Sequence, residues 1–242
     1  VEPSLQAAFI NFGRERHGFL AFNDIQSDYY QIPSDDKEKL RIAEEKIRED
    51  LKDKAADTFQ ENNQTAKPND DFSNNTKEED LEENKDNKKK NYREEVKSSF
   101  GIKRYKIQEV IKPGQVILIQ VIKEERGQKG AALTTFISLA GKYMVLMPNT
   151  AKGGGISRKI FNSEDRQKIR DILKGINIPK IMGVIVRTAG ANKTKNEIEK
   201  DFQNTLKTWE EIKDKALNSN APSLVYEEGD IIKRTLRDTY DN

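Results

Sequence analysis

The sequence predicts an α+β fold, in which a small antiparallel β-barrel with a long charged insertion is followed by an α/β domain. Two clusters of short apolar strands, separated by a polar segment, predict the barrel and the insertion. A buried strand between two amphipathic helices predicts the second domain. Since only 34% of the 242 residues are hydrophobic and 35% are charged, part of the chain is expected outside any packed core.

The two strand clusters are marked by alternating apolar residues between glycines and prolines. Residues 7–20, AAFINFGRERHGFL, contain two glycines and are typical of short curved strands joined by a tight turn. The second cluster follows a Pro-Gly turn at 113–114 and ends at Pro148, with the segments QVILIQVI, ALTTFISLAG and KYMVLMP. We assign residues 1–33 and 97–135 to the barrel.

Between the clusters, residues 34–96 form the predicted insertion. They carry 14 Lys and Arg against 20 Asp and Glu, and a helix is expected over 35–59, where apolar residues recur at four-residue spacing behind Ser34 as a candidate N-cap. Residues 61–91 contain only three apolar side chains, too few to offset the entropy of ordering them, so we expect disorder there. Such an insertion costs little, because loop-closure entropy grows slowly with length.

The α/β domain is assigned to residues 136–232. A helix is expected to open at Ser163 and to close at Gly175, and a buried strand, IMGVIV, covers 181–186. A longer helix begins near Lys195, and a further strand and helix are expected towards the end. Residues 233–242 would begin a following subdomain, so we expect the chain to be a fragment of a longer protein. The apolar side of the longer helix consists of Ile198, Phe202, Leu206, Trp209 and Ile212.

Composition excludes several kinds of site. The sequence has no cysteine and one histidine, His17, which excludes disulfides and thiolate metal sites and argues against a zinc site of imidazoles. Acidic residues gather in the insertion and on helix faces, so no catalytic metal centre is predicted. No apolar run approaches the roughly 18 residues that span a bilayer, and the N-terminus lacks a signal pattern, so we expect a soluble, cytoplasmic chain.

Residues 98–190 form a basic block, with 17 Lys and Arg against six Asp and Glu. A block of this kind favours a polyanion partner, although a solvated basic surface has the same composition.

Aromatic residues in the first strand cluster provide one candidate site. Phe9, Phe12 and Phe19 are placed in the predicted strands, and a ring exposed on a barrel face can stack on a nucleic-acid base for roughly 1–3 kcal/mol. Rings that fill the barrel core would have the same spacing, so both interpretations stay open. Lys129 lies in the glycine-flanked turn 123–133, where it can reach a phosphate or belong to an ordinary charged hairpin.

A second candidate site follows the buried strand. The guanidinium of Arg187 can grip a phosphate in two places, while Thr188 offers a hydroxyl and a backbone N–H. A terminal phosphate has more charge and more free oxygens than an internal diester, so a small pocket can select for it. The alternative is a helix-capping Thr188 and a structural ion pair of Arg187, which spacing does not exclude.

Taken together, the sequence resembles the bacterial ribonuclease E/G family in five segments: AAFINFGRERHGFL, VIKEERGQKGAALTTFISLAGKYMVLMPN, GGISRKI, MGVIVRTAG and LKTWEEIK. The match covers residues 1–33 and about 105–242. It implies an S-one-type OB barrel whose first strand would precede Val1, followed by a 5′ sensor domain that recognises RNA with a 5′-monophosphate. The segment between the two matched parts is longer and more polar than the corresponding loop of the family.

Carried onto matching positions, the resemblance implies two groups of binding residues. The barrel would contact single-stranded RNA, and the sensor would hold the terminal nucleotide and its phosphate. The barrel residues are Phe9, Phe19 and Lys129, and the pocket residues are Gly141, Val145, Arg158, Arg187 and Thr188.

The resemblance also implies a longer protein. Its magnesium-binding carboxylates, zinc-linking cysteines and tetramerising domain would lie beyond residue 242, so this stretch alone is expected not to cleave RNA. The whole would be a homotetrameric endoribonuclease of mRNA decay and rRNA processing, a candidate degradosome scaffold in the cytoplasm or peripherally on the inner membrane. Two alternatives remain, namely the ribonuclease G branch and a stand-alone RNA-binding module without nuclease activity.

Overall fold

The structure is a computed structural model that describes residues 1–46, 105–125, 130–150, 155–179, 181–229 and 231–239. The chain divides into two compact units, one formed by Val1–Gln31 with Lys106–Asn242 and the other by Ile32–Tyr105. The α+β class that the sequence predicts is confirmed.

The second unit contains a helix over the described residues 34–46. Ser34 is its first helical residue rather than its N-cap, since the Lys37 N–H already donates to the Pro33 carbonyl at 3.0 Å. The remainder of the expected helix and the expected disorder over 61–91 lie outside the described residues.

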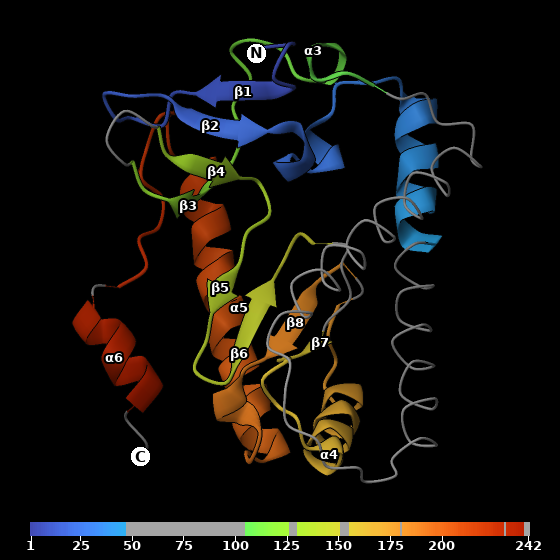
Figure 1. The fold of residues 1–242 in the computed structure, drawn as a ribbon, viewed down its shortest axis with the longest axis vertical. Helices are drawn as coiled ribbons and strands as arrows, with labels where there is room; N and C mark the ends of the chain where they lie inside the picture. Colours follow the sequence, from blue (N-terminus) through green and yellow to red (C-terminus); the bar gives the residue numbers. More distant parts are fainter. Residues whose placement is uncertain (47–104, 126–129, 151–154, 180, 230, 240–242) are drawn as a thin grey trace, which may run out of the picture. The chain divides into compact units, whose positions relative to one another are not determined.

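The first unit begins with a four-stranded mixed sheet of order β1-β2-β4-β3 (Figure 1). β1 (Ala7–Ile10) pairs antiparallel with β2 (Gly18–Ala21), which pairs parallel with β4 (Ala132–Thr134). β3 (Gln120–Lys123) pairs antiparallel with β4 and forms the other edge. The two strands expected within 7–20 are therefore confirmed.

This sheet is open, whereas the sequence predicts a barrel. β1 and β3 are its edges, and four strands of three or four residues are too few to close on themselves at the tilt that a barrel requires. The expected strand over 115–122 also begins later, at Gln120. The preceding residues bond to Tyr29 instead: the Gln115 side-chain amide donates to the Tyr29 carbonyl at 2.8 Å, and the Leu118 N–H donates to the Tyr29 hydroxyl at 3.3 Å.

A second sheet has the order β5-β6-β8-β7. β6 (Met144–Met147) is antiparallel to both β5 (Leu139–Ala140) and β8 (Gly183–Val186). β7 (Gly155–Ile156) is parallel to β8, so the chain leaves both strands at the same end of the sheet. The buried strand predicted at 181–186 is confirmed for its last four residues.

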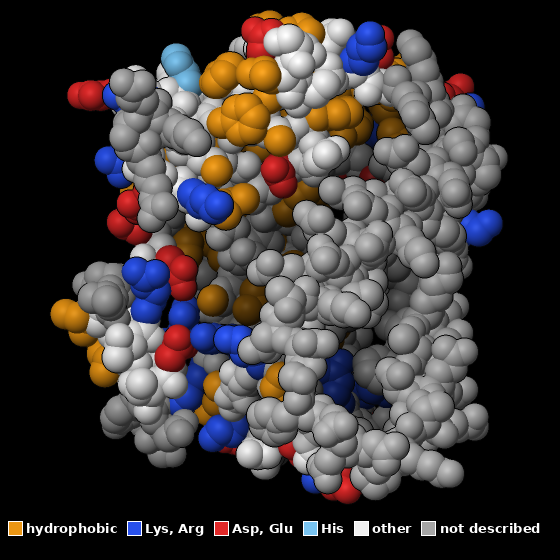
Figure 2. Space-filling model, in the orientation of Figure 1, with side chains coloured by type: hydrophobic (Ala, Val, Ile, Leu, Met, Phe, Trp, Pro, Cys, Tyr) orange, Lys and Arg blue, Asp and Glu red, His pale blue; other side chains and the backbone are white. Residues whose placement is uncertain are grey.

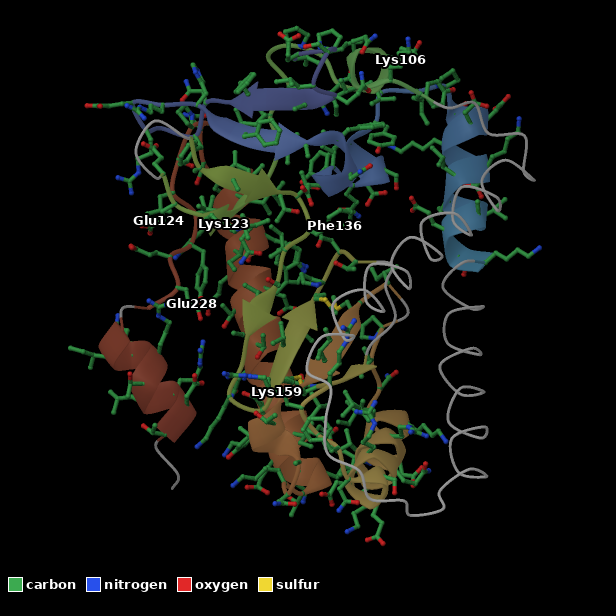
Figure 3. All side chains as sticks on the ribbon, in the orientation of Figure 1. Lys106, Lys123, Glu124, Phe136, Lys159 and Glu228 are labelled. Atoms are coloured by element: carbon green, nitrogen blue, oxygen red, sulfur yellow. The ribbon has the colours of Figure 1, made fainter. Side chains whose placement is uncertain are left out.

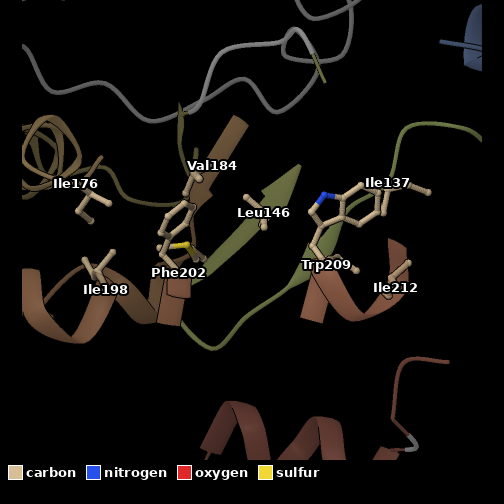
Figure 4. Close-up of a cluster of buried hydrophobic side chains, with 10 residues drawn as sticks. Ile137, Leu146, Ile176, Val184, Ile198, Phe202, Trp209 and Ile212 are labelled. Atoms are coloured by element: carbon tan, nitrogen blue, oxygen red, sulfur yellow. The ribbon is translucent and has the colours of Figure 1, made fainter. Parts of the chain in front are cut away.

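The main core lies between this sheet and helix α5 (Lys195–Leu217) (Figure 4). The helix starts with a capping box in which the Glu197 carboxylate accepts from the Thr194 N–H at 2.9 Å. Its predicted apolar side is confirmed, with Leu206 only partly buried. The buried members include Ile198, Phe202, Trp209 and Ile212 from the helix and Leu139, Met144, Leu146 and Val184 from the strands.

The described part of the unit also contains the single-turn helix α3 (Ile107–Val110) and two longer helices, α4 (Ser163–Lys174) and α6 (Ile231–Thr239). α4 begins at Ser163 as predicted, and its N-cap is Asn162, whose side chain accepts from the Glu164 N–H at 3.0 Å. Gly175 ends α4 as predicted. The strand expected before α6 (Ile231–Thr239) is absent, since the described residues 223–229 belong to no ladder. None of the described helices is long and apolar enough to cross a membrane.

Candidate nucleic-acid interface

Phe9 of β1 and Phe19 of β2 are cross-strand partners on the first sheet. Their ring centroids are 6.1 Å apart in an edge-to-face arrangement of 69°. The residues remain 51% and 38% exposed, and Figure 2 shows hydrophobic side chains gathered at the surface over β1 and β2. Of the two interpretations that spacing left open, the core one is therefore wrong for both rings.

The opposite side of the same strand pair forms the buried layer. Ala8 and Leu20 pair directly across the strands and are 2% and 0% exposed. Alternation along a strand therefore turns the neighbouring Phe9 and Phe19 outward. Phe12, expected in a strand, lies beyond the end of β1, and Lys129 lies outside the described residues.

Arg187 follows β8 directly and is clamped against the turn between β5 and β6. Its backbone N–H donates to the Tyr143 carbonyl at 2.8 Å, which extends the strand ladder by one bond. Its Nη1 donates to the carbonyls of Gly141 at 2.8 Å and Lys142 at 3.2 Å. Backbone atoms therefore fix the direction in which the guanidinium points.

The guanidinium also holds a carboxylate. Its Nη1 and Nη2 lie 2.8 Å from Oδ1 and 3.2 Å from Oδ2 of Asp238, on α6. Hydrogen bonds from Arg187, and then from Arg237, lower the pKa of Asp238 below its ordinary value. The ion pair considered as the alternative role of Arg187 is therefore present, and it shows that this guanidinium can bind an oxyanion with both of its terminal nitrogens.

The neighbours of Arg187 at this edge come from the strand pairing. Ile156 of β7 pairs with Val186, so Arg158 leaves the sheet beside Arg187 and is exposed there. Thr188 begins the short turn η3 (Thr188–Gly190), is exposed, and does not cap it, because the N-cap is Arg187. Arg158, Arg187 and Thr188 therefore follow two neighbouring strands at the same end of the sheet.

Gly141 and Val145, the remaining pocket residues, lie on the β5–β6 hairpin. Gly141 is buried, and its carbonyl holds Arg187. Val145 is half-buried in β6 and pairs with Ala140 and Ile185. All five predicted pocket residues thus lie in the β5–β6 hairpin or shortly after β7 and β8 of one sheet.

Sequence reasoning missed Asp201, which positions this hairpin. Its carboxylate accepts the backbone N–H groups of Lys142 at 3.1 Å, Tyr143 at 2.9 Å and Met144 at 3.2 Å. The turn is therefore held at its amides by Asp201 and at its carbonyls by Arg187. The available signal was a carboxylate between Ile198 and Thr205 on the otherwise apolar side of α5.

Two lysines add positive charge next to the turn. The Nζ atoms of Lys142 and Lys193 lie 5.3 Å and 5.2 Å from the centroid of the Tyr143 ring, within the range of cation–π attraction. Tyr143 is 9% exposed and supplies the carbonyl that receives the Arg187 N–H. The Tyr143 ring therefore attracts two ammonium groups close to the predicted phosphate pocket.

Comparison with known proteins supplies the family. Ribonuclease E of Escherichia coli is 36% identical over 238 residues, which is 98% of this chain. The model of the ribonuclease E/G family matches residues 138–242, the span that holds every predicted pocket residue. This chain belongs to the ribonuclease E/G family.

Other relatives agree with the assignment to the ribonuclease E/G family, which confirms the resemblance read from the motifs. Ribonuclease E of Haemophilus influenzae is 35% identical over 98% of this chain, and ribonuclease E of Synechocystis is 40% identical over 56% of it. This chain spans only 16%, 18% and 20% of the Escherichia, Haemophilus and Synechocystis proteins, respectively. The RNA-binding roles of the individual residues stay predictions.

Proposed function

We propose that this chain is the RNA-binding and 5′-monophosphate-sensing part of a single-strand-specific endoribonuclease. The observation that carries the proposal is the guanidinium of Arg187, which two backbone carbonyls hold in place while it binds an oxyanion at its Nη atoms. An RNA 5′-phosphate has the oxygens and charge that such a group recognises.

A terminal phosphate suits this edge better than an internal one. A phosphomonoester carries about −1.5 to −2 charges at pH 7 and three free acceptor oxygens. Arg187 can take two of these oxygens, and we expect the exposed Thr188 hydroxyl and Arg158, which follow the neighbouring strand ends, to bind the third. An internal diester has one charge and two free oxygens, and would leave part of this donor set unused.

The exposed rings of Phe9 and Phe19 would bind the RNA strand at nucleotides beyond its 5′ end. Stacking of bases on Phe9 and Phe19 depends on ring faces and not on base identity, which suits RNA of any sequence. We propose that the sheet β1-β2-β4-β3 is the described part of an OB-type barrel, with residues 34–96 inserted in one of its loops and Lys129 as a further RNA contact.

Phosphodiester hydrolysis, mRNA decay and rRNA processing are proposed for a longer protein. A homotetramer, a degradosome scaffold and a cytoplasmic location are proposed for it on the same grounds. Catalytic Mg²⁺ and inter-subunit Zn²⁺ do not fit the residues here, since the sequence has no cysteine and the described residues contain no group of three or more acidic or histidine side chains that could hold a metal. We therefore assign no catalytic step to this part of the chain.

The test compares two RNA oligonucleotides that differ only in a 5′-monophosphate or a 5′-hydroxyl, at fixed salt because phosphate binding is salt-dependent. The wild-type chain should bind the phosphorylated form more tightly. Arg187→Ala should weaken that form by about tenfold or more, the loss of a charge-assisted pair, and barely affect the other form. Arg187→Lys keeps the charge but loses the fork, so it should recover only part of the difference.

Arg170→Ala is the matched control, because Arg170 on α4 is half-buried, as Arg187 is, and its Nη1 donates to Gln167. It should affect both oligonucleotides alike, if at all. Equal losses on both forms from Arg187→Ala would make Arg187 a structural residue and refute the sensing proposal.

A further inference from the structure

Asp238 occupies the donors of Arg187 that a phosphate would use. Both carboxylate oxygens face the two Nη atoms, at 2.8 Å and 3.2 Å, while the side chains of Arg187 and Asp238 remain 29% and 38% exposed. A bidentate carboxylate and a bidentate phosphate use the same pair of guanidinium N–H groups. The exposed location also leaves a route by which another anion can arrive.

A second arginine anchors the carboxylate on its own helix. Arg237 Nε donates to Asp238 Oδ1 at 3.0 Å, and Arg237 Nη1 donates to Glu228 at 2.7 Å and to the Ala140 carbonyl at 3.1 Å. Figure 3 shows Glu228 just before α6, and Figure 2 shows charges of both signs at the surface beside this helix. If Asp238 leaves Arg187, it therefore retains a cationic partner.

We propose that Asp238 is a resident competitor for the RNA 5′-phosphate, so that binding of a phosphorylated 5′ end displaces this carboxylate and releases α6 from the sensor edge. This inference rests on the proposed function. The phosphomonoester can win the exchange because it brings up to twice the charge of the carboxylate. The carboxylate has the advantage of being tethered to the same chain, which gives it an effective concentration on the order of millimolar.

The competition has a thermodynamic consequence. Binding of a 5′-phosphate must first break the Arg187–Asp238 pair, which lowers the measured affinity. Phosphate binding and docking of α6 on the sensor therefore weaken each other. A 5′-hydroxyl RNA makes no demand on Arg187, so it leaves the pair closed. Whether the RNA carries a 5′-phosphate or a 5′-hydroxyl therefore determines whether α6 is docked.

The test uses the neutral isostere Asp238→Asn in the whole 242-residue chain. It should tighten binding of the 5′-monophosphorylated oligonucleotide by about three- to tenfold, the range of an exposed but bidentate ion pair, and leave the 5′-hydroxyl form unchanged. Asp214→Asn is the charge-matched control, because Asp214 is exposed on α5 away from Arg187. It should change neither affinity.

A second measurement follows α6 directly. The chain has one tryptophan, Trp209, and no cysteine, so a fluorescent acceptor attached through Arg234→Cys reports the distance from α5 to α6 by energy transfer. The phosphorylated oligonucleotide should change the transfer and the 5′-hydroxyl form should not.

Each other outcome overturns the inference in a distinguishable way. If wild type and Asp238→Asn prefer the phosphorylated end to the same degree and with the same affinity, the competitor role fails while the sensing function stands. Weaker phosphate binding by Asp238→Asn would show that Asp238 supports Arg187 instead of competing with RNA. An equal gain from Asp214→Asn would reduce the effect to overall charge. If no variant distinguishes the two RNA ends, the proposed function itself fails.

Discussion

Gly141 lies so close to the Asp201 carboxylate that a Cβ at this position would come within 2.6 Å of Oδ2. The same Cβ would meet the Thr205 hydroxyl at 2.9 Å. The hairpin turn therefore approaches α5 as closely as it can, and this approach lets one carboxylate accept three successive N–H groups. The opposite side of the turn supplies the carbonyls that orient Arg187. Packing and the predicted phosphate site thus depend on the same glycine.

Gly141→Ala should destabilise the fold by about 1–3 kcal/mol, because the added methyl group must push the turn away from α5. It should also weaken binding of the 5′-monophosphorylated RNA, since the carbonyls that hold Arg187 move with the turn. Urea denaturation and the two-oligonucleotide assay measure the two effects. Gly155→Ala is the control, because a Cβ at Gly155 meets nothing within 4 Å. If Gly155→Ala lost as much stability and affinity as Gly141→Ala, the close approach of Gly141 to α5 would not be the cause.

Asp201→Ala should cost about 2–3 kcal/mol of unfolding free energy, because it leaves turn amides near α5 without their acceptor. Asp201→Asn should cost less, since its amide oxygen can still accept while its NH₂ group faces a donor. Glu210→Ala, at an exposed position of the same helix, should be within about 0.5 kcal/mol of wild type. Chemical denaturation of the three variants settles the order, and equal stability of Asp201→Ala and Glu210→Ala would contradict the positioning role.

Phe9→Ala should weaken binding of both RNA forms alike, by roughly fivefold or more, because stacking does not sense the 5′ end. The fold should lose little stability, since the ring is 51% exposed. Phe161→Ala removes a ring that is 88% exposed elsewhere and should leave both affinities unchanged. An unchanged affinity of a folded Phe9→Ala chain would end the platform interpretation.

The sequence predicted most elements of the second domain because their signals are local. The apolar side of α5, the glycine that ends α4 and the run of β8 are all present at or near their predicted places. The described strands form an open sheet, and their order depends on how distant strands pair, as in the parallel contact of β2 with β4, which no local pattern specifies.

In the candidate site, too, the residues with a local signal were predicted and those that depend on distant contacts were not. Family motifs named Arg187, but its partner Asp238 lies 51 residues away along the chain, and Asp201 lies 57 residues or more from the turn residues whose N–H groups it accepts. Their roles arise only when α5 and α6 pack against the hairpin. Exposure of Phe9 likewise could not be decided by spacing, since Ala7, two residues earlier on the same face of β1, is buried while Phe9 is 51% exposed.

The preference for a phosphorylated 5′ end should increase between pH 5.5 and 7.5. Hydrogen bonds from Arg187 and then Arg237 lower the pKa of Asp238, so its stabilising contact is present above the ordinary range of an aspartate and is lost only as the pH falls well below 4. The resident carboxylate therefore stays ionised throughout this window. The phosphomonoester, in contrast, gains its second charge near pH 6 and becomes the stronger competitor as the pH rises.

The ratio of the two RNA affinities, measured at constant ionic strength, should grow several-fold across the window, and the 5′-hydroxyl form corrects for titration elsewhere in the chain. With Asp238→Asn the same rise should appear at tighter absolute binding, and a ratio that is flat in both proteins would contradict recognition of the dianionic phosphate.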